Sequence, residues 1–590
     1  MNNASSIEDN FPLIAQTLAQ EGFKIVSGIQ PAFEGMIREG GYDFEIIIRD
    51  INPSFESLPN VYLKEIPDKL TGLLPHVERN HKLCYLDTLG VFLDPFYPQR
   101  TTYVILDAIR NTLKKVSDPE QNQTDFAGEF HSYWHADTKC FLTTNEPKAE
   151  SCIYEHKGLN GKPTKEIVFT SGGEQRDHWC ELRNAQYDGF AFNDTAIIEM
   201  DDNPFIEVEK LWPPQNISDL LNWLKRVHPR VERKALLALL GIAKEYSAPK
   251  LIFQTQFGGP FGVSVKFSPS IKTMLGRYRV NKRKGKKSLS PKQMSTIRKI
   301  LCAPTSSQSF FRLEINDVSE RFVYERNLKT PSLKNRHIAI IGCGTVGGFA
   351  ASLLQKAGAG TGNKGQLDLY DDDILKPGNL GRHLLGANYL YESKSDATRD
   401  LILQNTSTPV NIQSYSKLSS AQLNIIKEYD LVIDLTGNEC FSNLLANKLV
   451  ELRLGRKTAP KLLYAWIDAN GYASRALLDD GSGACYRCLK IPDESRESGA
   501  LKERYPLFSS HKVEEELSVI AHRCGESYIP FSAGISNAAA GMVQQMALES
   551  FSDNPGFRFR HESHSKKINK TQDSNPTRIK SCPCCSRLQT

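Results

Sequence analysis

Six of the thirteen cysteines lie in the last quarter of the chain, and the spacing of four of them suits metal binding. Cys485 and Cys488 form one C-x-x-C pair, and Cys582 and Cys585 form a second. Each pair can direct two thiolates at one ion, and two pairs complete a tetrahedral Zn²⁺ site with no open coordination position. We therefore predict a structural zinc site, which leaves Cys584 as the odd cysteine of this cluster.

A glycine-rich turn marks a second site. The apolar run HIAII leads directly into GCGTVG, which a helical pattern follows. In this context the glycines allow a tight turn, and the helix N-terminus offers unpaired N–H groups to an anion. The sequence predicts a nucleotide-phosphate site at Gly342, Gly344 and Gly347. The turn alone does not select the nucleotide, because a nicotinamide-dependent dehydrogenase would carry the same one.

Charged residues beyond the next strand favour ATP. That strand ends at Asp371-Asp372-Asp373, where a carboxylate can accept hydrogen bonds from ribose hydroxyls. Asn379 and Arg382 follow, and Lys394 comes twelve residues after Arg382. Hydride transfer needs neither cation. Cleavage of ATP between its α and β phosphates develops negative charge that both could stabilise.

Composition limits the classes of function. A chain of 590 residues is too long for one core, so two to four domains are expected. The net charge of +5 is a small difference between 73 basic and 68 acidic residues, so we expect no direct nucleic-acid binding. We see no signal peptide and no apolar run of the ~18 residues that a membrane helix needs, so we expect reduced thiols, metal ligands or catalytic cysteines rather than a disulfide framework.

Three regions of different pattern must position these residues. Residues 1–150 predict a small α+β domain with a three-stranded antiparallel meander, and residues 151–320 a mixed α/β middle domain without assigned chemistry. Residues 321–590 alternate strands and helices, which predicts a doubly wound parallel sheet. The expected strands of the first two regions lie at 22–29, 42–51, 59–66, 205–212 and 248–257, and the expected helices at 11–21, 101–115, 218–227 and 232–246.

The third region resembles a known family. GCGTVGG, DDDILKPGNLGR, SKSDATRD and DLVIDLTGN, in this order, are similar to the adenylation core of the ubiquitin-activating and ThiF/MoeB-like enzymes, over roughly residues 320–590. The resemblance implies a Rossmann-like domain that uses ATP and Mg²⁺, with Asp371 at the ribose and Asn379, Arg382 and Lys394 at the phosphates. It also implies that Arg326 acts across a dimer interface.

The Mg²⁺ ligand stays open between two carboxylates. Asp373 and Asp434 both follow strands and could coordinate the ion. The family usually has aspartate before the asparagine of the motif that matches TGN, and this chain has Gly437 there. Asp434 is then the nearest substitute.

Cys524 is the candidate for the first nucleophile. It lies between the two cysteine pairs and ahead of a helix rich in small residues, and His522 and Arg523 precede it, which favours the thiolate. The local sequence alone is equally compatible with an inert loop cysteine. In the activating-enzyme family this position matches the cysteine that accepts an activated carboxylate.

The first domain resembles the ubiquitin-conjugating fold over roughly residues 10–145, with Cys84 of LPHVERNHKLCYLD at the position of the catalytic cysteine. The local sequence by itself favours a small buried hydrophobe at Cys84. His76, eight residues before it, stands where the family has asparagine and could donate a hydrogen bond to the thioester oxyanion. Asp87 could orient or deprotonate an incoming amine, or could cap a turn.

A conjugating domain ahead of an activating domain resembles the bacterial fusion enzymes of CBASS antiphage operons. The resemblance implies that the flexible C-terminus of a cGAS-like cyclic-oligonucleotide synthase is adenylated, carried on Cys524 and then Cys84, and joined to an amine of a target protein. It also implies a homodimer and a cytoplasmic location. Three alternatives remain: a sulfur-carrier adenylyltransferase with a non-catalytic N-terminal docking domain, a nicotinamide-dependent oxidoreductase, and a scaffold without catalysis.

Overall fold

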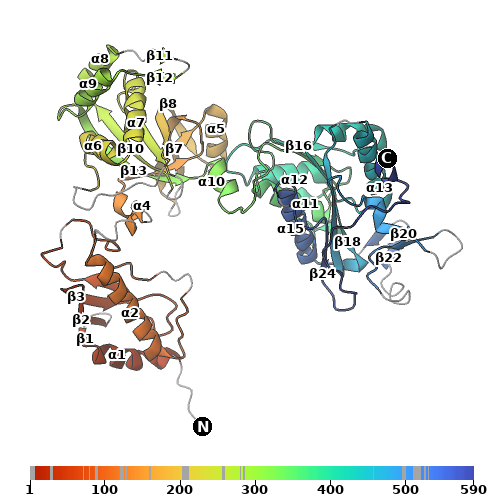
Figure 1. The fold of residues 1–590 in the computed structure, drawn as a ribbon, viewed down its shortest axis with the longest axis horizontal. Helices are drawn as coiled ribbons and strands as arrows, with labels where there is room; N and C mark the ends of the chain where they lie inside the picture. Colours follow the sequence, from red (N-terminus) through yellow and green to blue (C-terminus); the bar gives the residue numbers. More distant parts are fainter. Residues whose placement is uncertain are drawn as a thin grey trace, which may run out of the picture.

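The chain folds into three bodies in sequence order: an N-terminal domain, a β-barrel and a C-terminal α/β domain, with the barrel between the other two (Figure 1). This arrangement is a computed structural model. It describes all residues except 1–6, 27–30, 71, 79, 87–90, 120–124, 127–128, 158–160, 202–211, 256–258, 279–280, 284–285, 456–457, 494–499, 509–519, 524–525, 529, 554 and 590.

The N-terminal domain packs two helices against a four-stranded antiparallel sheet of order β1-β2-β3-β4. The predicted three-stranded meander is wrong by one strand, β2. Gly35 interrupts the apolar and polar alternation by which this strand could be recognised in the sequence. Glycine is needed there, because a Cβ would lie 2.5 Å from the ring of Phe23. The elements are α1 (Phe11–Gln20), β1 (Lys24–Val26), β2 (Ala32–Glu39), β3 (Tyr42–Arg49), β4 (Asn60–Leu63) and α2 (Pro98–Val116).

The middle body is a closed barrel of seven strands in the order β10-β13-β5-β7-β6-β8-β9. The helices and the strand expected near residues 218–246 and 250 are confirmed, whereas the strand expected at 205–212 lies almost entirely outside the described residues. The barrel begins within the range 1–150 that the sequence assigned to the first domain. Its strands are β5 (Thr138–Leu142), β6 (Lys148–Lys157), β7 (Pro163–Thr170), β8 (Gln186–Glu199), β9 (Lys250–Gln254), β10 (Phe261–Phe267) and β13 (Ser307–Asp317), and its helices include α5 (Gly173–Leu182), α6 (Ile217–Val227), α7 (Pro229–Ile242), α8 (Pro269–Gly276) and α9 (Pro291–Leu301).

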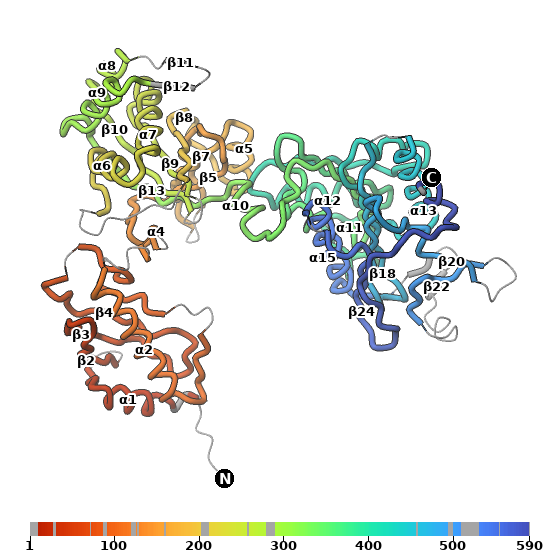
Figure 2. Tube along the Cα trace, viewed as in Figure 1, coloured from red at the N-terminus to blue at the C-terminus, as the bar shows by residue number. Residues whose placement is uncertain are grey.

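The chain enters and leaves the barrel on neighbouring strands that run parallel. β5 pairs with β13 in parallel register from Thr138 opposite Leu313 to Leu142 opposite Asp317. The entry through the short helix α4 (Phe130–Trp134) and the exit into α10 (Glu320–Glu325) therefore lie at opposite ends of these strands, separated by about 16 Å of strand. The trace in Figure 2 shows the N-terminal domain joined below the barrel and the C-terminal domain joined beside it.

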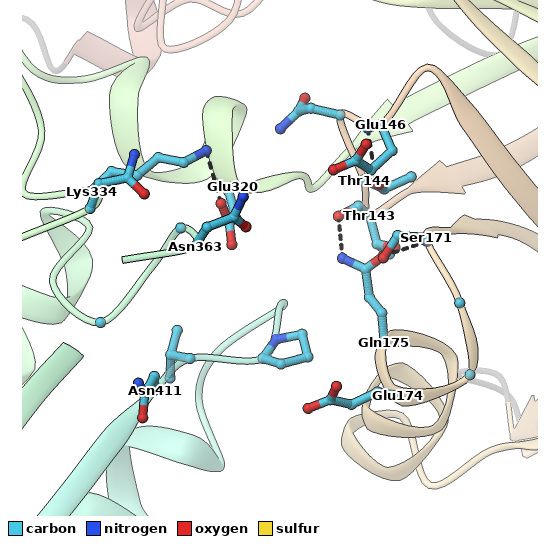
Figure 3. Close-up of a pocket in the computed structure, with 18 residues that line it drawn as sticks. Thr143, Thr144, Glu146, Ser171, Glu174, Gln175, Glu320, Lys334, Asn363 and Asn411 are labelled. Atoms are coloured by element: carbon cyan, nitrogen blue, oxygen red, sulfur yellow. Dashed lines mark hydrogen bonds and ion pairs between the residues drawn. The ribbon is translucent and has the colours of Figure 1, made fainter. Parts of the chain in front are cut away.

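The barrel also contacts the C-terminal domain directly. His178 of α5 donates a hydrogen bond from Nε2 to the carbonyl of Thr406 at 2.8 Å, and the hydroxyl of Ser407 donates to the carbonyl of Val318, next to the end of β13, at 3.2 Å. A polar cavity of about 880 Å³ lies between the two bodies (Figure 3). The hydrogen bonds and ion pairs drawn there stay within each side, such as Gln175 with Thr143 and Lys334 with Glu320.

The C-terminal domain contains a seven-stranded sheet of order β16-β15-β14-β17-β18-β19-β24, and its first five strands are parallel. The predicted doubly wound sheet is confirmed, with β19 and β24 added antiparallel at one edge. None of the helices in the described part of the chain combines the length and the apolar character that a membrane crossing requires. The elements are β14 (His337–Ile341), α11 (Thr345–Lys356), β15 (Gln366–Tyr370), α12 (Lys394–Leu403), β16 (Ile412–Tyr415), β17 (Leu431–Asp434), α13 (Glu439–Leu454), β18 (Lys461–Asp468), β19 (Ala473–Asp479), α15 (Ala533–Ser550) and β24 (Phe559–Ser563).

Candidate nucleotide site, metal centre and thiol positions

The glycine-rich turn has the geometry that the sequence predicts. Gly342 has φ +95°, and a Cβ on it would lie 3.0 Å from the backbone of Leu435. A Cβ on Gly347 would lie 1.8 Å from the carbonyl oxygen of Gly342. Only glycine fits either position, and α11 begins at Thr345, so its first N–H groups face the space beyond the sheet.

A pocket of about 350 Å³ opens beyond the carboxyl ends of β14, β15 and β17. This is where ligands bind in open α/β sheets. The pocket is lined by Ile341, Gly342, Gly344, Tyr370, Asp371, Asp372, Asp373, Lys394, Lys417, Leu418, Leu435, Thr436, Asn438 and Phe441. Five residues predicted from the sequence are therefore brought together here, and we call this space the nucleotide pocket.

The two outer carboxylates of the Asp371–Asp373 run are used differently. Asp371 accepts hydrogen bonds from the N–H groups of Cys343 at 2.6 Å and Asp373 at 2.8 Å, and burial raises its pKa. It therefore fastens the glycine-rich turn to the end of β15. Burial opposes ionisation of Asp373 too, but the ammonium of Lys394, 2.5 Å away, lowers its pKa overall.

Lys394 is the buried cation of the nucleotide pocket. It begins α12, and its side chain is held against Asp373, whose own side chain is 46% exposed. A phosphate entering the pocket would meet the ammonium with the carboxylate beside it. The pair can thus orient a lysine donor whose own side chain is largely buried, where its charge acts more strongly than in water.

The remaining phosphate candidates lie around the pocket rather than in its lining. Asn379 caps a short turn by accepting from the N–H of Lys376 at 3.0 Å. The guanidinium of Arg382 stacks on the ring of Phe531, 5.0 Å from its centroid. Phe531 follows Cys524 by seven residues, so Arg382 contacts the end of the segment that carries the candidate nucleophile. Cys524 itself lies outside the described residues.

Arg326 lies apart from the nucleotide pocket of its own chain. It stacks on Phe322 of α10 at 4.8 Å and borders a cavity at the exit of the barrel. Arg326 is therefore not one of the residues that line the nucleotide pocket of its own chain.

Asp434 is committed to a structural turn. It is 3% exposed; one carboxylate oxygen accepts from the hydroxyl of Thr436 at 2.7 Å and the other from Ser442 at 2.6 Å. Burial raises its pKa. Gly437 has φ +62°, and a Cβ there would meet nothing within 4 Å. Of the two Mg²⁺ candidates, Asp373 is the one that lines the pocket.

Sequence reasoning missed His383, which supports the glycine-rich turn from behind. Its Nε2 donates to the carbonyl of Cys343 at 3.0 Å, and its Nδ1 accepts from the N–H of Leu385 at 3.1 Å. Burial lowers its pKa to about 4, so the ring is neutral near pH 7. Apart from its place next to Arg382, no sequence signal distinguishes it.

The four predicted metal-ligating cysteines converge in one buried cluster. Their sulfur atoms all lie within 4.8 Å of one another. The Sγ atom of Cys485 is 3.8 Å from those of Cys488 and Cys582, and the Sγ atoms of Cys488 and Cys585 are 3.5 Å apart. Tetrahedral thiolates at the Zn–S distance of about 2.3 Å would be about 3.8 Å apart, so the cluster fits this ion. Cys584 is buried beside the four.

Cys84 is exposed, contrary to the buried alternative that its local sequence favours. Val77 and Leu83 form an antiparallel bridge, and the N–H of Cys84 donates to the carbonyl of His76 at 2.8 Å. The eight-residue spacing thus brings His76 opposite Cys84, and we call the described residues 74–78 and 80–84 the Cys84 turn.

The ring of His76 faces two carboxylates. Nδ1 lies 2.8 Å from Glu129 and Nε2 lies 2.9 Å from Asp125. Both ring nitrogens are therefore occupied, and the ring lacks the free N–H that the expected oxyanion contact requires. Asp87, the candidate for the incoming amine, lies outside the described residues.

Comparison with known proteins matches both outer bodies. Residues 320–582 match the model of the ThiF family, and residues 9–143 match that of the Prokaryotic E2 family B. The chain is 26% identical over 569 residues to the ATP-dependent ubiquitin transferase-like protein Cap2 of Escherichia coli strain TW11681, covering 93% of this chain and 92% of that protein. A Pseudomonas aeruginosa protein of the same name is 27% identical, with 91% of each chain covered.

A different relative aligns with only part of the chain. The adenylyltransferase and sulfurtransferase MOCS3 of Drosophila persimilis is 31% identical over 161 residues, which are 27% of this chain and 33% of that protein.

Proposed function

We propose that this chain, an ATP-dependent transferase, couples the C-terminus of a partner protein to an amine through two cysteine thioesters. The enzyme class follows from the joining of a prokaryotic E2-type domain to a ThiF-family adenylation domain in one chain. The observation that carries the proposal is the presence, in one chain, of a nucleotide pocket with a buried lysine and of an exposed cysteine in an E2-type domain. A sulfur-carrier adenylyltransferase would not need the second feature.

The first step is adenylation. An oxygen of the partner's C-terminal carboxylate attacks the α-phosphorus of ATP, the bond to the β-phosphate breaks, and pyrophosphate leaves. The glycine-rich turn and the N-terminus of α11 would hold the phosphates, and Lys394 would stabilise the charge that develops on them. Asp373 would hold Mg²⁺, which supplies further neutralisation of phosphate charge when it is bound.

The next two steps move the acyl group between sulfur atoms. The thiolate of Cys524 attacks the acyl carbon, and AMP leaves. Arg382 could support this step, because its stacking on Phe531 joins the phosphate side of the domain to the end of the Cys524 segment. Cys84 then attacks the same carbon, and the thiolate of Cys524 leaves. Each transfer conserves the activation that ATP supplied.

The last step forms an amide. An amine of the target attacks the Cys84 thioester, the Cys84 thiolate leaves, and the amine proton passes to a base, for which Asp87 is the candidate. We assign the partner to the cGAS-like synthases and the setting to antiviral defence in the cytoplasm. The fusion architecture, shared along nearly the whole of two ubiquitin transferase-like relatives, supports this assignment. The active form is a homodimer in which Arg326 reaches the partner's pocket. Zn²⁺ occupies the four-cysteine cluster.

The passage of the acyl group from Cys524 to Cys84, which we call the relay, makes a direct prediction. Incubation with ATP, Mg²⁺ and the candidate synthase should give thiol-sensitive adducts on gels run without reductant. Cys524→Ala should abolish all adducts, whereas Cys84→Ala should retain the Cys524 thioester and lose the amide product. Cys440→Ala, which removes another exposed cysteine, is the control and should behave like the wild type. Amide formation at the wild-type level in Cys84→Ala would refute the second thioester.

A second prediction concerns the Mg²⁺ ligand. Gly437→Asp should lower the Mg²⁺ concentration that gives half-maximal ATP–pyrophosphate exchange, because the position has room for a side chain beside the nucleotide pocket. The left-handed backbone should cost about 1 kcal/mol of stability. Gly437→Ala is the matched control, since it has the same strain without the carboxylate. If both variants have the wild-type Mg²⁺ dependence, the ion is held elsewhere.

A further inference from the structure

The connector between the N-terminal domain and the barrel packs into the barrel on one side and contacts the Cys84 turn on the other. Its described residues are 125, 126 and 129–134, and they include the single turn α4. Phe130 and Trp134 are buried in the aromatic core of the barrel, where the rings of Phe130 and Phe261 are 4.6 Å apart and Trp134 Nε1 donates to the carbonyl of Leu313. The connector is therefore anchored in the barrel. Figure 1 shows α4 between the two bodies.

The other side of the connector reaches the Cys84 turn. The hydroxyl of Tyr133 accepts a hydrogen bond from the N–H of His76 at 2.9 Å and donates to Glu129 at 3.1 Å. Glu129 in turn contacts Nδ1 of His76, so both residues of the connector hold the same histidine. Tyr133 is 3% exposed, so its own contacts are shielded from bulk water, whereas the side chain of Glu129 is 27% exposed. Asp125 occupies the second ring nitrogen and also pairs with Lys115 of α2 at 2.9 Å.

The backbone conformation of His76 is unusual. Its φ of +62° lies in the left-handed region, which residues other than glycine rarely adopt. The backbone of His76 is bonded on both sides of the Cα: its N–H donates to Tyr133, and its carbonyl accepts from the N–H of Cys84. Any rotation of this residue would therefore move the backbone directly opposite Cys84.

We propose that Tyr133 and Glu129 are positioning residues for acyl transfer at Cys84, acting through His76. The connector lies within residues 9–143, which match the E2 family, but its aromatic side chains are anchored in the barrel. The barrel thus holds the residues that fix His76, and Cys84 is fully competent only while His76 is docked on the connector. This inference rests on the proposed function, because it assumes that Cys84 carries a thioester.

The contacts give the docked state a pH dependence. A hydrogen bond to Glu129 raises the pKa of His76 above its ordinary value, against the opposing effect of burial. The groups that face the ring are Glu129 and Asp125, with Lys115 and the Tyr133 hydroxyl beside them. Although burial opposes it, the hydrogen bond from Lys115 lowers the pKa of Asp125, which stays ionised. The stabilisation is complete below the ordinary pKa of histidine and is lost as the pH rises through the raised value.

The test is discharge of preformed Cys84 thioester by added lysine in single turnover. Tyr133→Phe keeps the ring that packs against Phe126 and removes only the hydroxyl. We expect it, like Glu129→Gln, to lower the maximal discharge rate roughly fivefold with an unchanged dependence on lysine concentration, as for loss of one hydrogen bond of ordinary strength. ATP–pyrophosphate exchange should not change, and Glu146→Gln, at an exposed glutamate of the barrel, should be silent.

The pH profile separates positioning from a loss of stability. The difference between wild type and Glu129→Gln should be largest below the raised pKa of His76 and should shrink above it. Wild-type discharge rates in both variants at every pH would overturn the inference and leave the relay intact. Absence of any Cys84 thioester in the wild type would overturn the proposed function and this inference with it.

Discussion

Lys394→Ala should reduce ATP–pyrophosphate exchange by about a thousandfold, the scale on which preorganised charge at a transferring phosphoryl group contributes to catalysis. Lys394 is the buried cation of the nucleotide pocket, and its ammonium is fixed 2.5 Å from Asp373. Its removal takes away a donor to the phosphate oxygens. It also leaves the carboxylate of Asp373 unpaired at the place where negative charge develops, so two effects add.

A double variant separates these effects. If repulsion from the unpaired carboxylate contributes, Asp373→Ala in the Lys394→Ala background should recover part of the lost activity. Lys427→Ala, at an exposed lysine paired with its neighbour Glu428, provides the control for a simple loss of positive charge. Exchange within threefold of the wild type in Lys394→Ala would remove this lysine from the phosphate site.

Cys485→Ser should lose the bound metal and lower the free energy of unfolding of the C-terminal domain by several kcal/mol, because binding free energy at a structural site of this kind is folding free energy. The four cysteines pack against Ala446 and Val450 of α13. This helix is capped by Asn438 and contains Phe441 in its first turn, and both residues line the nucleotide pocket. A loosened cluster should therefore also reduce adenylation.

Metal analysis of the purified protein and thermal unfolding are the measurements. Cys584→Ser is the matched control, because Cys584 is buried in the same cluster but is not one of the four converging sulfurs. It should retain the ion and nearly the wild-type melting temperature. Wild-type protein with well under one ion per chain would refute the zinc site, as would full stability of Cys485→Ser.

The elements that the sequence predicts well are those with short-range patterns. The glycine-rich turn, the parallel strands and the cysteine pairs are all defined within a few residues, and their geometry is as expected. The barrel was not predicted as a barrel, because its closure depends on pairings such as β5 with β13, which are remote in sequence. Irregular pairing of β6 with β8 also disrupts the alternation that would mark these strands.

The environment of His76 could not be predicted for the same reason. Its two carboxylate partners lie 49 and 53 residues away in the chain, on a connector whose sequence shows no motif. The histidine itself was found from its spacing to Cys84, but the direction of its ring depends on how two bodies dock. Likewise, His383 acts through a backbone carbonyl, which has no sequence signature.

The parallel pairing of β5 with β13 has a kinetic consequence. Since the chain enters at one end of this strand pair and leaves at the other, the barrel would act, under the proposed function, as a spacer between the bodies that carry Cys84 and Cys524. A flexible tether would set their encounter frequency by its length, through polymer statistics. Here the folded barrel, packed on the connector at one end and hydrogen-bonded to the C-terminal domain at the other, would set the separation of the two bodies instead. If the proposed transfer operates, insertions in the surface loops of the barrel should change its rate little, whereas a shift of register between β5 and β13 should change it strongly.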